Sequence, residues 1–299
     1  MAGPKYYTNS FFAMNTRCDM VFICDDPEFA ERVAGIVRSE IEQVEITISR
    51  FLPDSPVSRF NSMKADEQFY PGEVLWAMIS DCLHFSKITE GAFDITSYPV
   101  IRLWKDLEEG SVPDDSEIHN AFLSSGFDKL VLDEQAKSIR KIVDGVQLDF
   151  GAAGKGIAMD LIRDILGKQG IRQAFISFGE SSILAAGTHP AGDSWPVGIV
   201  NPMDPEEMLH VFKVVDGIVT TSGTVTRDSG GRLRQRKHII DPRQGTAVSG
   251  NSIVSVKSSS GLLGEALSTA WFILSDEEKA EVRKRILDMD IVQFNFNEV

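Results

Sequence analysis

The sequence predicts an α+β fold with mixed or antiparallel sheets flanked by helices. Segments with strand-like apolar patterns and segments with apolar residues at helical spacing both occur along the chain. They do not alternate strictly, as the strands and helices of a doubly wound parallel sheet would. With 299 residues, of which 42% are hydrophobic and 25% charged, the chain can bury a substantial core. No repeat and no linker rich in Pro, Gly or Ser divides it, so we expect one domain over residues 1–299.

The first half of the chain begins with a strand and a long helix. The strand is expected at residues 18–24, and apolar residues then recur at helical spacing, with Asp25 or Asp26 before Pro27 as the N-cap. The segments that follow are expected to be a loop at 52–62, a helix at 73–88 that stops at Gly91, and strands at 129–132, 138–142 and 146–149.

A glycine-rich stretch, LDFGAAGKGIAMD, occupies residues 148–160. Glycines at 151, 154 and 156 let the backbone approach a ligand closely, and amides at the start of a following helix would point at an anion. The stretch is not a Walker loop, because Lys155 is followed by glycine, and it does not fit the register of a dinucleotide fingerprint. Spacing alone leaves two interpretations open, a phosphate site and a tight structural turn.

Beyond this stretch the chain returns to strands and ends in helices. The helix after the glycines is expected to start at residue 157 and to stop at Gly167 or Gly170. A capping box, Ser275-Asp-Glu-Glu278, opens the last expected helix. The other expected elements are strands at 174–178, 182–186, 195–200, 210–215, 235–240 and 252–257, and a helix at 262–274.

Charge and composition narrow the possible partners and compartments. The formal charge of −14 argues against a nucleic-acid partner, because such binding needs a surplus of Lys and Arg on one face. The basic cluster RLRQRKH at 232–238 is either a solvated strand pair or the cationic wall of a small-ligand site. Three cysteines without a CxxC spacing suggest neither a disulfide framework nor a zinc site. No apolar run approaches a membrane span and no signal sequence is evident, so we expect a cytoplasmic protein, or an exported one if a signal was removed.

Three short segments carry candidate site residues, and each also has a purely structural interpretation. None of the five histidines has a metal-ligand spacing, but His238 precedes Asp241 in KHIIDPRQG, which is at least a turn. Glu265 and Thr269 lie four apart, so on a helix they share a face and can offer two oxygens to a hard cation, or simply belong to the start of a helix. Asp94 can cap the turn after the second helix, or belong to a site.

Taken together, these stretches resemble the FAD:protein FMN transferase family, formerly described as thiamine-biosynthesis lipoproteins. Seven stretches match the family, in the family's order, along nearly the whole chain. One match alone would be weak evidence, but seven in the same order are specific. They are AMNTRCDM at 13–20, SRFLPDSPVSRFN at 49–61, EGAFDITSYPVIRLW at 90–104, LDFGAAGKGIAMD at 148–160, TTSGTVTR at 220–227, HIIDPRQGTAV at 238–248 and GEALSTAWFIL at 264–274.

The resemblance implies an α+β unit with FAD in a cleft and a divalent metal, usually Mg²⁺, at the FAD diphosphate. Members transfer the FMN half of FAD to a Thr or Ser hydroxyl of an acceptor protein and release AMP. Some members instead hydrolyse FAD to FMN and AMP. Either reaction attacks a diphosphate phosphorus, where a metal neutralises charge and the protein chiefly positions groups. The resemblance therefore implies that the glycine-rich stretch serves the FAD diphosphate and its metal.

The resemblance also assigns roles to single residues. The metal ligands fall on the backbone carbonyl of Gly154 and on the side chains of Glu265 and Thr269. The positions implied to contact FAD are Met14, Phe51, Ala92, Phe93, Asp94, Gly151, Lys155, Ile157 and Ile240.

The catalytic candidates are His238, Asp241 and Asp94. The first two match the HxxDP turn of the family, and we hypothesise that one of them orients the phosphate or the incoming hydroxyl. The resemblance assigns no general base among them.

Three positions depart from the family pattern. Gly154 stands where alanine is common, Glu265 where aspartate is usual, and Val225 where the TSGxYxR stretch has tyrosine. The side chain of Glu265 is one methylene longer than that of aspartate, which can shift the metal or oblige it to keep a water. Two alternatives to a transferase therefore stay open, an FAD pyrophosphatase and a flavin-binding protein without turnover.

Overall fold

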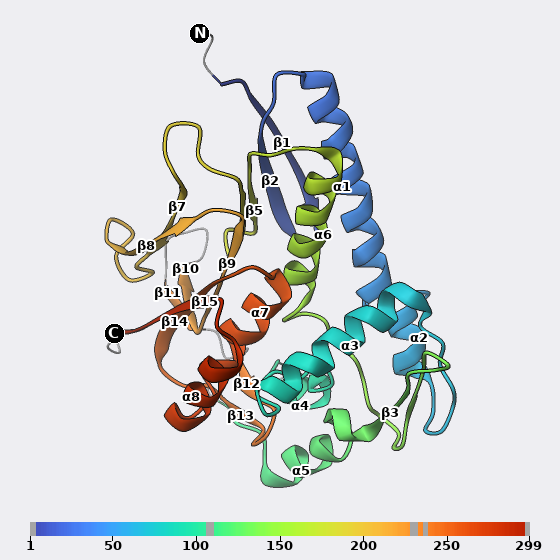
Figure 1. Cartoon of the computed structure of the whole chain (residues 1–299). Helices are drawn as coiled ribbons and strands as arrows, with labels where there is room; N and C mark the ends of the chain where they lie inside the picture. Colours follow the sequence, from blue (N-terminus) through green and yellow to red (C-terminus); the bar gives the residue numbers. More distant parts are fainter. Residues whose placement is uncertain (1–3, 106–110, 228–232, 236–238, 297–299) are drawn as a thin grey trace.

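Seven strands form one antiparallel sheet, to which the rest of the protein is attached (Figure 1). The computed structural model describes residues 4–105, 111–227, 233–235 and 239–296. Neighbouring strands follow the order β1-β2-β5-β6-β9-β14-β15 and pair antiparallel. Their bounds are β1 (Tyr6–Ala13), β2 (Thr16–Ile23), β5 (Ala174–Phe178), β6 (Ser182–Ala186), β9 (Gly217–Gly223), β14 (Asn251–Ser258) and β15 (Met289–Phe296).

The two faces of the sheet are covered differently (Figure 1). Helices α1 (Pro27–Ile48), α6 (Gly154–Gln169) and α7 (Gly261–Ala270) pack on one face, and the antiparallel pair β7 (Trp195–Val200) and β8 (Met208–Val214) packs on the other. In β9, Ile218 joins the core under the helices and its neighbour Val219 joins the core under the β7–β8 pair. Successive strand residues point to opposite faces, so one strand serves both cores.

A third core joins the segment between α1 and α6 to the C-terminal helices. Phe60, Phe93 and Leu148 share one cluster of buried side chains with Ala266 of α7 and with Trp271. The elements of this part are α2 (Pro56–Ser62), α3 (Gly72–Ile88), α4 (Tyr98–Lys105), α5 (Asp115–Leu123), β3 (Leu130–Asp133), β4 (Ser138–Lys141) and α8 (Asp276–Arg285). Two short ribbons complete the description, β10 (Val225–Arg227) with β11 (Leu233–Gln235) and β12 (Ile240–Asp241) with β13 (Thr246–Ala247).

The α+β prediction is confirmed, and so are the predicted helix ends that rest on capping chemistry. The Asp26 side chain accepts hydrogen bonds from two backbone amides of the first turn of α1. Ser275 and Glu278 form both halves of the capping box of α8. Gly170 closes α6 in the left-handed conformation, whereas Gly167 lies inside the helix.

Other predicted elements are wrong. The segment at 52–62 contains α2 rather than a continuous loop, because Ser55 caps a helix whose first residue is Pro56. Residues 146–149 form no strand, and only Gln147 makes an isolated bridge. Helix α6 begins at Gly154 instead of residue 157, and α7 ends at Ala270 instead of residue 274.

The strands β1, β9 and β15 and the helices α4 and α5 have no counterpart among the predicted elements. The strand predicted at 235–240 corresponds to the ends of two short strands, β11 and β12, and residues 236–238 between them lie outside the described residues. Of the basic cluster at 232–238, the structure describes only 233–235, which belong to β11.

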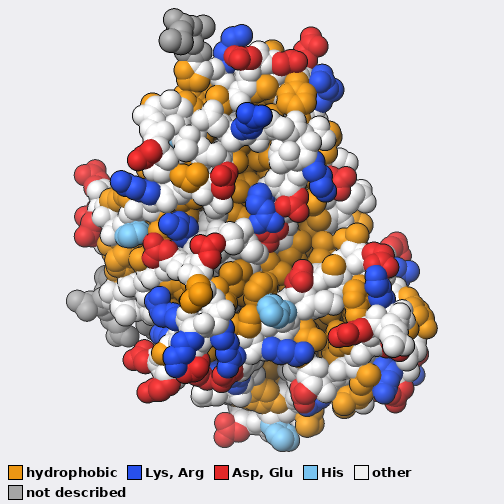
Figure 2. Space-filling view, viewed as in Figure 1, with side chains coloured by type: hydrophobic (Ala, Val, Ile, Leu, Met, Phe, Trp, Pro, Cys, Tyr) orange, Lys and Arg blue, Asp and Glu red, His pale blue; other side chains and the backbone are white. Residues whose placement is uncertain are grey.

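The surface carries charge of both signs. Figure 2 shows Lys and Arg side chains interspersed with Asp and Glu over the face that it presents, with hydrophobic side chains between them. Among the described residues, no helix combines the length and the apolar character needed to cross a membrane.

Candidate active site

A cavity of about 510 Å³ lies where the glycine-rich stretch, β9 and α7 meet. Its size falls in the range of small-molecule sites in proteins, which is roughly 300–1,000 Å³. Most of its lining comes from five segments that are distant in sequence, at 92–97, 149–155, 221–225, 239–242 and 265–269. Five of the motifs that sequence analysis singled out therefore meet at one place.

The glycine-rich stretch is a tight structural turn, which was one of the two interpretations that the sequence left open; the phosphate site stays a prediction. The stretch turns tightly, because the carbonyl oxygen of Phe150 accepts hydrogen bonds from the amides of Ala153 and Gly154, at 2.9 and 2.7 Å. It also borders the cavity with Gly151 and Lys155. Helix α6 starts here, and no side chain caps its N-terminus, so the positive end of the helix dipole lies beside the cavity.

Gly156 serves the packing of α6 against α7 rather than the cavity. A Cβ atom at this position would lie 2.4 Å from the carbonyl oxygen of Gly261, so the backbones of the two helices touch there. Asp160, one turn further along α6, accepts hydrogen bonds from the amides of Gly261 and Leu262 at 2.9 and 3.0 Å. These contacts fix the start of α7, and with it the helix that carries Glu265 and Thr269.

Glu265 is buried and paired with a cation. Its Oε1 atom accepts hydrogen bonds from Lys155 Nζ and from Ser182 Oγ, both at 2.7 Å. The carboxylate is only 4% exposed, so its charge depends on this ion pair. Thr269, one turn further along α7, also lines the cavity. Gly154 lies beside this group but is buried and does not line the cavity.

The side chains at this point suit an oxygen-preferring cation that takes few ligands from the protein. Glu265 supplies a carboxylate and Thr269 a hydroxyl, both on the cavity wall. Within the described part of the chain, no group of three or more His, Cys, Asp and Glu side chains could hold a metal ion. Such a small donor set matches Mg²⁺, which usually binds one or two carboxylates and completes its shell with water and phosphate oxygens.

Asp94 lines the same cavity but has a different environment. Its Oδ1 atom accepts hydrogen bonds from the backbone amide and the hydroxyl of Thr96, each at 2.7 Å. Burial raises the pKa of Asp94 to about 6, although the hydrogen bonds from Thr96 oppose this shift. A carboxyl group with this pKa exchanges its proton near neutral pH. Ala92 and Phe93 line the cavity beside it, and both are buried.

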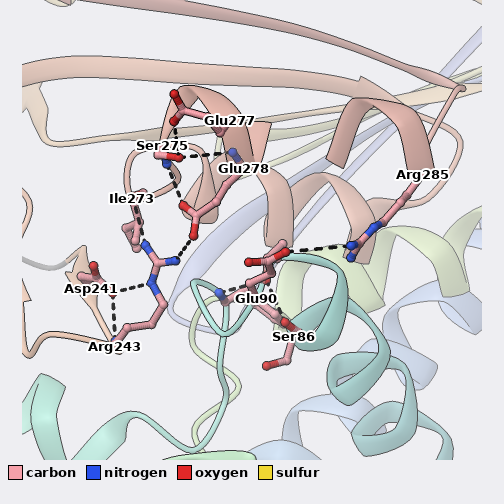
Figure 3. A network of polar contacts seen from close by, with 11 residues as sticks. Ser86, Glu90, Asp241, Arg243, Ile273, Ser275, Glu277, Glu278 and Arg285 are labelled. Atoms are coloured by element: carbon pink, nitrogen blue, oxygen red, sulfur yellow. Dashed lines mark hydrogen bonds and ion pairs between the residues drawn. The ribbon is translucent and has the colours of Figure 1, made fainter. Parts of the chain in front are cut away.

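Asp241 does not line the cavity, although its neighbours Ile240 and Pro242 do. Its Oδ1 atom accepts hydrogen bonds from the backbone amide of Arg243 at 2.9 Å and from Nε of the same residue at 3.2 Å. Arg243 in turn donates to Glu278 Oε1 at 2.6 Å and to the carbonyl oxygen of Ile273 at 3.2 Å (Figure 3). The carboxylate therefore holds a turn against the corner between α7 and α8, and the catalytic role of Asp241 stays a prediction. His238 lies outside the described residues.

Three positions implied to contact FAD do not line the cavity. Met14 has a left-handed backbone conformation in the turn between β1 and β2, near Gly154. Phe51 is 69% exposed, and its ring packs against the guanidinium group of Arg50. Ile157 is buried in the core shared with α7. The predicted residues that the cavity brings together are Ala92, Phe93, Asp94, Gly151, Lys155, Ile240, Glu265 and Thr269.

Several residues at or next to the cavity wall received no role in the sequence analysis. Ser182 binds the Glu265 carboxylate, and Thr221 and Ser222 at the end of β9 line the cavity. Their hydroxyls are held by Ser255 and Ser268, each at 2.9 Å. The hydroxyl-rich stretch TTSG was visible in the sequence, but only the sheet shows that it faces the glycine-rich stretch. Val225, which replaces a family tyrosine, also lines the cavity.

Comparisons with known proteins show which family the chain resembles. The model of the ApbE family matches residues 14–292. The FAD:protein FMN transferase of Chlamydia trachomatis is 28% identical over 259 residues, which cover 85% of this chain and 79% of the relative. The FAD:protein FMN transferase of Vibrio cholerae is 25% identical over 242 residues, covering 79% of this chain and 72% of the relative.

Solved structures show the same fold. The flavin transferase ApbE from Vibrio cholerae superposes with a TM-score of 0.84 at 22% identity, covering 98% of this chain and 94% of the other. The apo form of the flavinyl transferase ApbE from Pseudomonas stutzeri gives a TM-score of 0.81 at 25% identity, with 95% and 90% covered.

Proposed function

The chain belongs to the ApbE family, and on that premise we propose that it transfers the FMN portion of FAD to a Thr or Ser hydroxyl of an acceptor protein. The acceptor oxygen bonds to the FMN phosphorus, the bond from that phosphorus to the bridging oxygen breaks, and AMP leaves with this oxygen. The hydroxyl proton must pass to a base. Names of relatives support this reaction, and so does one cavity that unites the glycine-rich stretch, Asp94 and the Glu265–Thr269 pair.

The residues around the glycine-rich stretch fit an anionic ligand. The uncapped N-terminus of α6 and the Lys155 ammonium group both supply positive charge at the cavity wall. Gly151 leaves the wall without a side chain there. In this proposal the diphosphate of FAD lies against this wall, and Ala92, Phe93 and Ile240 border the space for the rest of the substrate.

Glu265 and Thr269 are the side chains that would hold Mg²⁺, with the diphosphate supplying further oxygens. When bound, the metal would withdraw negative charge from the phosphate oxygens and assist in-line displacement. Lys155 already offsets the charge of Glu265 in the structure, which supports the idea that this carboxylate needs a cation at all times.

Asp94 is our candidate for the base that takes the proton of the acceptor hydroxyl. Its pKa of about 6 leaves most of the carboxyl groups ionised at pH 7.5, and yet basic enough to accept a proton. Thr96 fixes the orientation of the carboxylate through two hydrogen bonds.

The proposal treats residues 1–299 as one domain. It does so because the cavity wall takes residues from segments as far apart in sequence as Ala92 and Thr269.

The test is to incubate the protein with FAD and Mg²⁺, with and without EDTA, and with and without an acceptor protein that carries candidate threonines. AMP, free FMN and protein-bound flavin are then quantified. We expect AMP that depends on the metal and is matched by flavin covalently bound to the acceptor. AMP matched by free FMN would instead establish an FAD pyrophosphatase, and FAD binding without AMP for any acceptor would establish a binding protein.

A further inference from the structure

Arg50 lies beside the cavity and has no role in the site described so far. Its guanidinium carbon is 4.0 Å from the ring centre of Phe51 and 3.9 Å from that of Tyr98. Its Nε atom is 3.1 Å from Asp149 Oδ2. The side chains of Arg50 and Asp149 are only 16% and 13% exposed. Arg50 therefore contacts two rings and forms a largely buried ion pair.

Asp149 connects Arg50 to two parts of the cavity wall. Its Oδ1 atom accepts a hydrogen bond from the amide of Gly151 at 2.8 Å, and its own amide donates to the carbonyl oxygen of Ile95 at 2.7 Å. Asp149, Gly151 and Ile95 all line the cavity. Asp149 therefore joins Arg50 to the glycine-rich stretch and to Ile95, the residue that follows Asp94.

The charges around the cavity show why Asp149 needs a cation. Asp94, Asp149 and Glu265 place three carboxyl groups on the wall, and Lys105 and Lys155 place two ammonium groups there. Lys155 is already paired with Glu265. Without Arg50, the Asp149 carboxylate would stand unpaired next to the wall that we assign to a diphosphate. Like charges in a partly buried site repel each other more strongly than in water.

The contact with Phe51 is the second function of Arg50. Phe51 is 69% exposed and lies between α1 and α2. The guanidinium group of Arg50 lies against this ring and also against the ring of Tyr98, so Arg50 ties Phe51 to a second aromatic side chain. This contact favours one orientation of the Phe51 ring.

We propose that Arg50 is a positioning residue for FAD, which neutralises Asp149 beside the diphosphate and holds the ring of Phe51 for contact with the flavin. This inference rests on the proposed function, because it concerns binding of FAD. Arg50 acts through Asp149 and Phe51 and needs no contact with the reacting atoms.

The test compares Arg50→Met, Asp149→Asn and the double variant with the wild type. FAD affinity is measured without Mg²⁺ by the change in flavin fluorescence, at low and at high salt. We expect Arg50→Met to weaken FAD binding by about tenfold or more, because it leaves Asp149 unpaired. Asp149→Asn in the Arg50→Met background should restore most of this affinity, and high salt should reduce the defect of Arg50→Met.

Two further variants separate positioning from folding. Arg50→Lys keeps the charge but not the planar stacking, so it should bind FAD better than Arg50→Met and yet alter the fluorescence of bound flavin. Arg283→Met removes an arginine that stacks on Trp271, 5.0 Å from its ring centre and away from the cavity lining, and should leave FAD affinity unchanged. Melting temperatures of all variants identify any that do not fold. If Arg50→Met does not fold, FAD binding by Arg50→Lys and by the double variant still tests the proposal.

The proposal is overturned if Arg50→Met, or Arg50→Lys in its place, binds FAD like the wild type with the same flavin fluorescence. It is also overturned if the double variant is as weak as Arg50→Met. Wild-type protein that binds no FAD would instead refute the proposed function itself, so the two failures are distinguishable.

Discussion

Asp94 and Glu265 are two carboxyl groups on the wall of one cavity, and they differ in their partners. Asp94 receives hydrogen bonds from the neutral groups of Thr96, and burial raises its pKa to about 6. Glu265 is paired with Lys155 and hydrogen-bonded to Ser182. The two environments support the two roles that we propose for these carboxyl groups, exchange of a proton by Asp94 and binding of a cation by Glu265.

The largest effect on the rate of AMP release should come from substitutions of Glu265 and Thr269, the proposed metal ligands. Glu265→Ala removes the carboxylate and leaves Lys155 without its partner, and Thr269→Ala removes the neighbouring hydroxyl. We expect either change to abolish metal-dependent release of AMP, measured at saturating Mg²⁺. Binding of Mn²⁺, followed by its paramagnetic signal in the absence of turnover, should weaken in parallel. Full activity of either variant would remove that residue from the metal site, and Glu265→Asp is the control that keeps the charge.

A smaller but still large effect on the rate of AMP release should come from substitution of Asp94, the proposed base. Asp94→Asn keeps the shape of the side chain and removes the proposed base; a general base typically contributes a factor on the order of 10²–10⁴ to a rate. We expect the rate of AMP release to fall by about 10² or more, with Mn²⁺ affinity unchanged. If metal affinity fell as well and the rate loss disappeared at high metal concentration, the two carboxyl groups would share one role and the comparison would be wrong.

The pH dependence of stability should follow Asp94 with a defined sign. The pKa of Asp94 in the folded protein, about 6, lies above its ordinary value of 3.8, so protonation favours the folded state. Its stabilising contribution is fully present below about pH 3.8 and is lost as the pH rises through about 6. Asp94→Asn should remove this part of the pH dependence, which urea unfolding at several pH values would measure.

A third carboxylate, Asp241, should show the smallest effect on the rate. Its partner Arg243 ties the turn to Ile273 and Glu278, so Asp241→Asn should lower the free energy of unfolding by about 1–3 kcal/mol, measured by urea unfolding. A rate that stays within a few-fold of the wild type in the folded variant would assign Asp241 to the turn alone. A rate loss as large as that of Asp94→Asn would establish the catalytic role that the sequence predicted.

Local chemistry explains which parts of the fold could be predicted from the sequence. The N-cap at Asp26 and the capping box at Ser275 are short-range patterns, and the structure confirms both. The helix α2 was missed although its Ser55-Pro56 start is also local, because polar residues around it resemble a loop. The strand β9 was missed because its register is set by β6 and β14, which lie far away in sequence.

In the candidate site too, local features could be predicted from the sequence and long-range contacts could not. The Glu265–Thr269 spacing is a property of one helix, so the sequence predicts a shared helix face, and both residues do line the cavity from α7; their role as metal ligands stays a prediction. The ion pair between Lys155 and Glu265 joins residues 110 apart and depends on the packing of α6 against α7. Ser182 and Arg50 escaped notice for the same reason, since only the tertiary structure brings them to Glu265 and Asp149.

The most direct test of the division between the two carboxyl groups is the pH dependence of AMP release between pH 5 and 8, at saturating FAD and Mg²⁺. The wild-type rate should rise with pH through about 6, as the Asp94 carboxyl group ionises, and then level off. Asp94→Asn should be slow with no rise in this range. If the Asp94→Asn profile rose through the same pH as that of the wild type, another group would be the base and the roles assigned here would be contradicted.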